Sequence, residues 1–131
     1  MRFKASIEEQ QQPSPFEVFV MHMLHAATNA HILHWQRKFP QHVALGEFYE
    51  ALPGMLDNLV EAYQGRKSKL KNYPTDFKLP PDDPVVYMQS LQDELDNLRV
   101  QPGFPQESQF QNEVDNIANL ISSTLYKVRD L

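Results

Sequence analysis

Residues 30–64 of this 131-residue chain read AHILHWQRKFPQHVALGEFYEALPGMLDNLVEAYQ. The segment holds three of the five histidines, the only tryptophan and several carboxylates at helical spacing. Phe39 precedes Pro40, and a residue before proline disfavours α geometry. We therefore expect one helix to end near Lys38 and a second to open at Pro40. A turn this short predicts that the two helices pack side by side in opposite directions.

The first of these helices should begin at Ser14, working outward from the turn towards the N-terminus. Ser14 can cap the helix, Pro15 suits its first position, and Glu17 completes a capping box. At about 100° per residue, one narrow stripe is predicted to form the core face. The stripe comprises Phe16, Val20, Leu24, Ala27, His31 and His34.

The second helix carries two adjacent stripes, offset by about 100° on the helical wheel. The apolar stripe comprises His42, Leu45, Tyr49, Leu52, Leu56, Val60 and Tyr63. The acidic stripe comprises Gly46, Glu50, Asp57, Glu61 and Gln64. Pro53 and Gly54 predict a kink or local break in this helix, and Gly65 is a suitable stop.

Residues 66–83 form a long connection whose length suits a crossover along a bundle. A third helix should open at Pro84 and end before Pro102, and a fourth should run from about Ser108 to the end. The apolar face of the third helix comprises Tyr87, Leu91, Leu95 and Leu98. The wholly apolar stripe of the fourth comprises Phe110, Val114, Ile117, Ile121, Leu125 and Val128. The pattern predicts an all-α, antiparallel four-helix bundle with a crossover.

Length and composition indicate one domain, with a flexible N-terminal arm at residues 1–13 and the bundle at residues 14–131. The net charge of −5 argues against a broad electrostatic grip on nucleic acid. The absence of cysteine removes disulfides, thiolate zinc sites and cysteine nucleophiles, and it fits a cytoplasmic protein. No apolar run approaches the ~20 residues of a membrane span, and we expect no signal peptide.

Four cations cluster at the start of the connection: Arg66, Lys67, Lys69 and Lys71. The favoured interpretation is a solvated helix end whose cations suit the helix dipole. A contact with phosphate or nucleic acid is the alternative.

Histidines and carboxylates together make a ligand set for iron, manganese or zinc. His31 and His34 lie one turn apart, as do Asp57 and Glu61, and Glu50 lies two turns before Asp57. Ligands must converge on a metal within ~2.0–2.2 Å. Taken singly, each residue is more often a hydrogen-bonded core histidine or a solvated acid. Taken together, two neighbouring stripes carry complementary ligand types, which favours a metal site.

A di-iron centre inside one helical bundle uses Glu-x-x-His motifs, and this sequence contains none. The fourth helix also has no polar residue on its stripe. Both observations argue against a di-iron core within one chain. A site between subunits remains, because the acidic stripe lies beside the core stripe, where it could face a second copy.

His34-Trp35, a short turn, and a helix with Asp57-x-x-x-Glu61 resemble the Dps-type branch of the ferritin-like superfamily over residues 28–64. In that family a His-Trp pair closes the first helix, and ligands of two subunits meet across a two-fold interface where iron is oxidised. The resemblance implies a ferritin-like homo-oligomer with ferroxidase activity. It matches His34 to the first histidine and Asp57 and Glu61 to the acidic pair.

His42 is the candidate for the second histidine of the family, although the eight positions from His34 are fewer than the Dps spacing. The alternative register places Gly46 there, which has no side chain to bind a metal, and aligns Glu50 with the family's intermediate acid. His31 would be a ligand or would orient one. The carboxylates would neutralise the ion and the imidazoles would set its geometry.

The segments HILHWQ, EFYEALPGMLDNLVEAYQG and LISSTLYKVRDL also resemble small ferritin-like proteins encoded by tailed phages. This second resemblance covers most of the chain and implies the cytoplasm of a host cell. It supports an alternative function, a metal-free helical phage accessory or interaction protein. Such a protein would bind its partner through the acidic stripe or the end of the fourth helix.

Overall fold

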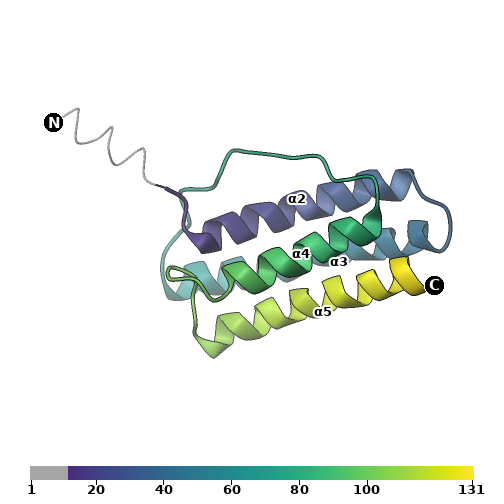
Figure 1. Cartoon of the computed structure of the whole chain (residues 1–131). Helices are drawn as coiled ribbons and strands as arrows, with labels where there is room; N and C mark the ends of the chain where they lie inside the picture. The colour runs from purple at the N-terminus through teal and green to yellow at the C-terminus, as the bar shows by residue number, and fades with distance from the viewer. Residues whose placement is uncertain (1–11) are drawn as a thin grey trace.

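A computed structural model describes residues 12–131, and all regular secondary structure in that range is helical. The helices are α2 (Pro15–Trp35), α3 (Gln41–Arg66), α4 (Pro84–Leu98) and α5 (Ser108–Asp130). Figure 1 shows the four lying alongside one another as a bundle. The prediction of a four-helix, all-α chain is confirmed over these residues. Most of the predicted N-terminal arm lies outside them.

The chain path divides the bundle into two hairpins (Figure 1). α2 and α3 are joined by the turn at residues 36–40, and α4 and α5 by residues 99–107. Between the hairpins, residues 67–83 run along the bundle and return the chain to the end where α2 stops. We call residues 67–83 the crossover. It starts and ends close to where the sequence predicted.

The helix starts follow the capping chemistry of the sequence. The Ser14 side chain accepts from the Glu17 backbone N–H at 3.1 Å, and the Glu17 carboxylate accepts from the Ser14 N–H at 2.9 Å, which completes the capping box. Asp83 accepts from the Val85 N–H at 2.9 Å in the same way at α4. α2 ends at Trp35, earlier than the predicted Lys38.

α3 is one uninterrupted helix across Pro53, so the local break suggested by the sequence does not occur. Pro53 and Gly54 are both exposed. The missing proline N–H costs α3 one internal hydrogen bond on its solvent side, where water can solvate the freed carbonyl.

The core confirms the α5 stripe in full and corrects the α2 stripe. On α2 the buried apolar residues are Phe16, Phe19, Val20, Met23, Ala26, Ala30 and Leu33. Leu24 is 43% exposed, and His31 and His34 are half-buried at the edge of the core. On α3 the buried residues include Phe48 and Leu59 beside the predicted leucines. The stripe on α2 was misplaced because apolar residues surround most of that helix.

Two buried polar residues of α2 hold the crossover. The Glu17 carboxylate accepts backbone N–H bonds from Lys71 at 3.0 Å and Asn72 at 2.7 Å. The Asn29 side-chain amide donates to the Lys78 carbonyl oxygen at 3.0 Å. Glu17 and Asn29 are 6% and 4% exposed, respectively. The crossover is therefore fixed to α2 at two points rather than lying free in solvent.

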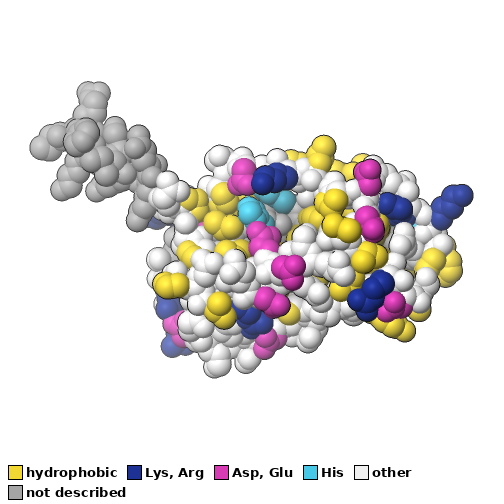
Figure 2. Space-filling view, viewed as in Figure 1, with side chains coloured by type: hydrophobic (Ala, Val, Ile, Leu, Met, Phe, Trp, Pro, Cys, Tyr) yellow, Lys and Arg dark blue, Asp and Glu magenta, His cyan; other side chains and the backbone are white. Residues whose placement is uncertain are grey.

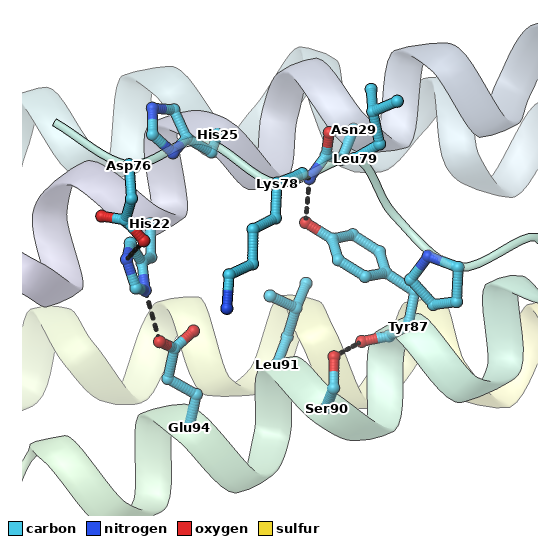
Figure 3. Close-up of a pocket in the computed structure, with 11 residues that line it drawn as sticks. His22, His25, Asn29, Asp76, Lys78, Leu79, Tyr87, Ser90, Leu91 and Glu94 are labelled. Carbon is cyan, nitrogen blue, oxygen red and sulfur yellow. Dashed lines mark hydrogen bonds and ion pairs between the residues drawn. The ribbon is translucent and has the colours of Figure 1, made fainter.

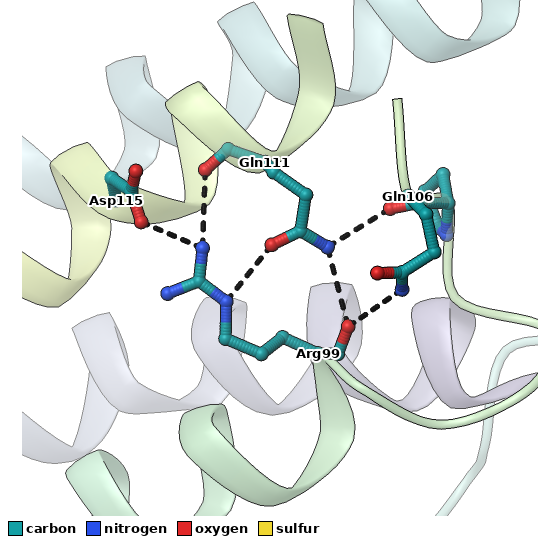
Figure 4. Close-up of polar contacts among 5 residues, drawn as sticks. Arg99, Gln106, Gln111 and Asp115 are labelled. Atoms are coloured by element: carbon teal, nitrogen blue, oxygen red, sulfur yellow. Dashed lines mark hydrogen bonds and ion pairs between the residues drawn. The ribbon is translucent and has the colours of Figure 1, made fainter. Parts of the chain in front are cut away.

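A network of polar contacts closes the turn between α4 and α5 (Figure 4). The Arg99 guanidinium donates to the Gln111 side-chain oxygen at 2.9 Å and to Asp115 at 2.6 Å. The Gln111 amide donates in return to the carbonyls of Arg99 and Pro105. Gln106 also donates to the Arg99 carbonyl. The bonds to Arg99 satisfy a carbonyl that the end of α4 leaves without a helical partner, and the bond to Pro105 ties the connection to α5.

Two cations of the basic cluster join α3 to α5. Lys67 forms an ion pair with Glu107, which lowers the pKa of that carboxyl group. Arg66 donates to the Gln109 side chain at 3.0 Å. Both contacts fit the favoured interpretation of this cluster as a solvated helix end. In the described range, no helix combines the length and the apolar character needed to cross a membrane.

Candidate metal centre

The turn between α2 and α3 brings His34 and His42 into direct contact. Their rings stack with centroids 3.7 Å apart and planes 18° apart. Nδ1 of His34 lies 2.5 Å from the His42 carbonyl oxygen, and Nδ1 of His42 lies 2.7 Å from the His34 carbonyl oxygen. The two residues thus form a reciprocal pair across the turn.

The reciprocal bonds fix the tautomer of both rings. A carbonyl oxygen can only accept, so Nδ1 must carry the proton in His34 and in His42. In a neutral imidazole Nε2 then bears the free lone pair. A backbone carbonyl on Nδ1–H is the arrangement that commonly orients a metal-binding histidine. Both residues are half-buried, so part of each is exposed to solvent.

Because Gly46 has no side chain, the His34 ring can pack closely against α3 at this position. A Cβ at position 46 would lie 3.2 Å from His34 Cε1 and 3.3 Å from its Nδ1. His31 lies one turn before His34 on α2, and its ring stacks on Tyr49 at 4.0 Å and lies tilted by 51° against Trp35 at 4.7 Å. Its ring is 6.1 Å from that of His34. His31 therefore lies in a cluster of aromatic rings beside the histidine pair.

The three predicted acids do not join the histidines within one chain. Glu50, Asp57 and Glu61 are all exposed on α3. Asp57 is fifteen residues from His42 along the same helix, which is about 22 Å at 1.5 Å per residue. Among residues 12–131, no three histidine or carboxylate side chains are grouped so that they could hold a metal ion. The structure brings together His34 and His42, with His31 nearby, and leaves the acids apart.

A second polar cluster lies beneath the crossover, where the sequence interpretation placed no site. A cavity of about 280 Å³ that opens to the surface is lined by α2, α4 and the crossover (Figure 3). We call it the crossover cavity. The polar residues that line it are His22, His25, Asn29, Asp76, Lys78, Tyr87, Ser90 and Glu94. Figure 2 shows histidine side chains beside acidic ones near the middle of this face.

One end of the crossover cavity is charged. Nδ1 of His22 contacts the Glu94 carboxylate, and its Nε2 lies 3.8 Å from Asp76. His25, one turn further along α2, packs edge-on against Phe77 with centroids 4.8 Å apart. Burial and the nearby charge of His22 lower the pKa of His25, and the charge of Asp76 partly offsets them.

The other end of the crossover cavity is lined by neutral side chains. The Asn29 amide nitrogen donates to the Tyr87 hydroxyl at 3.1 Å. Burial raises the pKa of Tyr87 to about 12, against a smaller lowering by the Asn29 bond, so the phenol keeps its proton. The other amide atom, Asn29 Oδ1, is buried and has no hydrogen-bond partner among the described residues.

Comparison with protein families gives one decisive match. The model of a family described as "Family of unknown function (DUF5856)" matches residues 34–128, which are 95 of the 131 residues. The chain belongs to the DUF5856 family. Searches of curated proteins and of solved structures found no match.

The DUF5856 match begins at His34 and includes His42 and the three acids of α3, but it leaves out most of α2. It therefore covers the α4 wall of the crossover cavity and not the α2 wall. A signal for that wall was present in the sequence, since His22, His25 and Asn29 recur at helical spacing on one face. Their partners Asp76 and Lys78 lie in the crossover, whose path no periodicity predicts.

Proposed function

We propose that the protein is a ferritin-like helical bundle of the Dps type that self-associates and binds iron at a site shared between two copies. The observation that carries the proposal is the His34–His42 pair, whose Nδ1 atoms are bound to backbone carbonyls and whose Nε2 atoms are free to bind a metal. The antiparallel hairpins joined by a crossover also fit that architecture.

The site needs a second copy because the acids lie too far from the histidines of their own chain. Asp57 and Glu61 are one turn apart and exposed on one face of α3, so a partner could approach them together. In a two-fold dimer each contact occurs twice, and imidazoles of either copy would meet carboxylates of the other. Trp35 and Phe39, which lie between His34 and His42 in the sequence, have aromatic side chains that are 70% and 80% exposed. Apolar surface of this kind is characteristic of an interface.

Iron is the substrate in this proposal. The carboxylates offset the charge of Fe(II), and the neutral imidazoles fix the direction of approach. Oxidation removes one electron from each Fe(II) and passes it to dissolved dioxygen, which is reduced with protons from solvent. Manganese and zinc suit the same ligands and would compete with iron for them.

The test is a metal analysis of protein purified without a histidine tag, followed by Fe(II) titration under air and absorbance detection of Fe(III). Asp57→Asn and Glu61→Gln are exposed, so the variants should fold. We expect each to slow oxidation about tenfold or more, since even residues that only support a metal ligand contribute 10–100-fold. Asp96→Asn, on the exposed side of α4, is the matched control and should oxidise iron at the parent rate.

A metal-free interaction protein is the second candidate, and the same exposed Trp35 and Phe39 favour it. It would use the turn between α2 and α3 to hold another protein, with His34 and His42 serving only to lock that turn. Absence of bound metal, together with oxidation no faster than the buffer blank, would reject the iron site and leave this candidate.

A further inference from the structure

An open groove runs between α3 and α5. The two helices lie side by side over their length, because Arg66 contacts Gln109 at one end and Lys127 contacts Glu47 at the other. The groove has a volume of about 560 Å³ and opens to the surface. The crossover lies over α2 and α4, so the groove is on the opposite side of the bundle.

The groove has an apolar part and a polar part. Met55 of α3 and Leu120 of α5 line it, and both are partly buried where they pack against the edge of the core. Asn58, Asn116 and Asn119 also line it, and all three are exposed. An apolar strip flanked by exposed polar side chains is typical of a groove that binds a segment of another protein.

The face around the groove carries only negative charge away from the helix ends. Residues 42–65 of α3 and 108–126 of α5 contain no lysine or arginine. Glu113 lines the groove, and Glu50, Asp57 and Glu61 are exposed on α3. None of these four carboxylates forms an ion pair with the described residues. A positively charged partner would therefore be attracted to this face.

The helices of this chain cannot supply that positive charge. The lysine and arginine residues within α2, α3, α4 and α5 are Arg66, Lys127 and Arg129, and all three lie in the last turn of their helix. A second copy placed groove against groove would bring acids against acids, which is unfavourable. The charge of the groove therefore favours a different protein as its occupant.

The dimensions of the groove suit a short helix. Glu113 and Ser123 both line it and are ten residues apart on α5, which is about 15 Å or nearly three helical turns. A third helix can place its side chains between those of two packed helices. An extended peptide would need the free edge of a sheet, and residues 12–131 contain no strand.

We propose that the groove between α3 and α5 binds a basic amphipathic helix of another protein. Apolar side chains three or four residues apart on that helix pack on Met55 and Leu120, and its lysine or arginine side chains pair with Glu113. Asn58, Asn116 and Asn119 face its polar flank. Met55, Glu113 and Leu120 are not among the proposed iron ligands, so the inference goes beyond the proposed function and does not depend on it.

The test is a fluorescence anisotropy titration of a labelled peptide with the full chain. The peptide contains leucine and lysine, spaced to form an amphipathic helix of about four turns. A second peptide has glutamate in place of lysine, and a third has the same composition with leucine and lysine alternating, which favours a strand. We expect the helical lysine peptide to bind and the other two to bind at least about tenfold more weakly. Equal binding of the alternating peptide, or no binding of the helical lysine peptide, would overturn the proposal.

Two variants with the same change in net charge locate the binding. Asn116→Lys places a cation in the groove, and Gln89→Lys places one on α4, and both positions are exposed. We expect Asn116→Lys to weaken binding of the helical lysine peptide about tenfold and Gln89→Lys to leave it near the parent value. Equal weakening by both would mean that the peptide responds only to net charge, and would reject the site.

Sedimentation of the same proteins without peptide tests a second copy as the occupant. We expect Asn116→Lys and Gln89→Lys to have the same mass as the parent at each concentration. A parent mass above that of one chain that falls in Asn116→Lys, but not in Gln89→Lys, would assign the groove to self-association and overturn the proposal.

Discussion

At the scale of single residues, the Glu17 carboxylate stands out because it accepts hydrogen bonds from two separate parts of the chain. One carboxylate closes the capping box of α2 with Ser14 and also accepts two backbone N–H groups of the crossover, from Lys71 and Asn72. Burial by itself raises the pKa of Glu17, but these backbone hydrogen bonds outweigh it and the net pKa lies below the ordinary value. A depressed carboxyl pKa means that the charged form stabilises the fold.

Glu17→Gln should lower the free energy of unfolding by about 1–3 kcal/mol at neutral pH, because an amide cannot replace a charged acceptor of several N–H groups. The folded pKa is below the unfolded one, so this contribution is present above the ordinary pKa of 4.5 and is lost as the pH falls through the folded value. Urea unfolding of parent and variant between pH 7 and strongly acidic pH should therefore give curves that converge at low pH. The exposed control Asp96→Asn should differ from the parent by less than about 0.5 kcal/mol. A difference between Glu17→Gln and the parent that stays constant with pH would contradict this account.

The candidate metal ligands show which features of the site could be predicted from the sequence and which could not. The resemblance to Dps-type proteins put His34 and His42 forward for one metal site, and the structure brings their rings into contact. Their Nδ1 bonds to each other's backbone were not predictable, because they depend on the conformation of the turn. The acids of α3 were placed on one face by periodicity alone, and that face is exposed.

At the scale of elements, the predicted core stripe was correct for α5 and misplaced for α2. The α5 stripe was predicted residue by residue because the large apolar residues of that helix are confined mostly to one face. The α2 stripe was misplaced because its sequence offers apolar residues on several faces, and burial by three neighbours, α3, α4 and the crossover, decides which of them form the core. Helix ends with a capping residue, such as those at Ser14 and Asp83, were predicted closely.

Two of the three glycines of α3, Gly46 and Gly54, provide a test of local packing. Around Gly54 a Cβ would meet nothing within 4 Å, whereas at Gly46 it would press on the His34 ring. Gly54→Ala should raise the free energy of unfolding by about 0.5–1 kcal/mol through helix propensity alone. Gly46→Ala should gain less than Gly54→Ala, or lose stability, because His34 must move while it is bonded to the His42 carbonyl. Thermal unfolding of the two variants, side by side, measures the difference, and an equal gain at both positions would mean that the His34 ring is not held.

At the scale of the whole molecule, the arrangement of hairpins leaves one end of the bundle apolar at its surface. Trp35 and Phe39 lie at the turn between α2 and α3 and are among the most exposed large apolar side chains of the described residues. The fold of one chain does not cover them. Neither residue was predicted to be exposed in this way, because exposure at a turn depends on how the two hairpins pack.

Self-association at this end should change the fluorescence of the single tryptophan. Trp35 is 70% exposed in one chain, so its emission should resemble that of indole in water when the protein is dilute. We expect the emission maximum to move to shorter wavelength as the concentration rises, in step with the mass measured by sedimentation. Phe39→Ser should shift both transitions to higher concentration. An increase in mass without a spectral change would place the interface on another face.

The anchoring of the crossover has a consequence for how the chain can be divided. Ser68 and Lys69 are exposed, while the two anchor points on the crossover lie after them, at Lys71–Asn72 and at Lys78. A backbone nick between Ser68 and Lys69 would divide the chain into two halves, each with an apolar face that packs against the other half in the core. After cleavage at an inserted protease site, they should remain one particle on a sizing column and, once unfolded and separated, regain their helical circular dichroism only when remixed. The protein would then serve as a split reporter whose reassembly depends on the grip of Glu17 and Asn29.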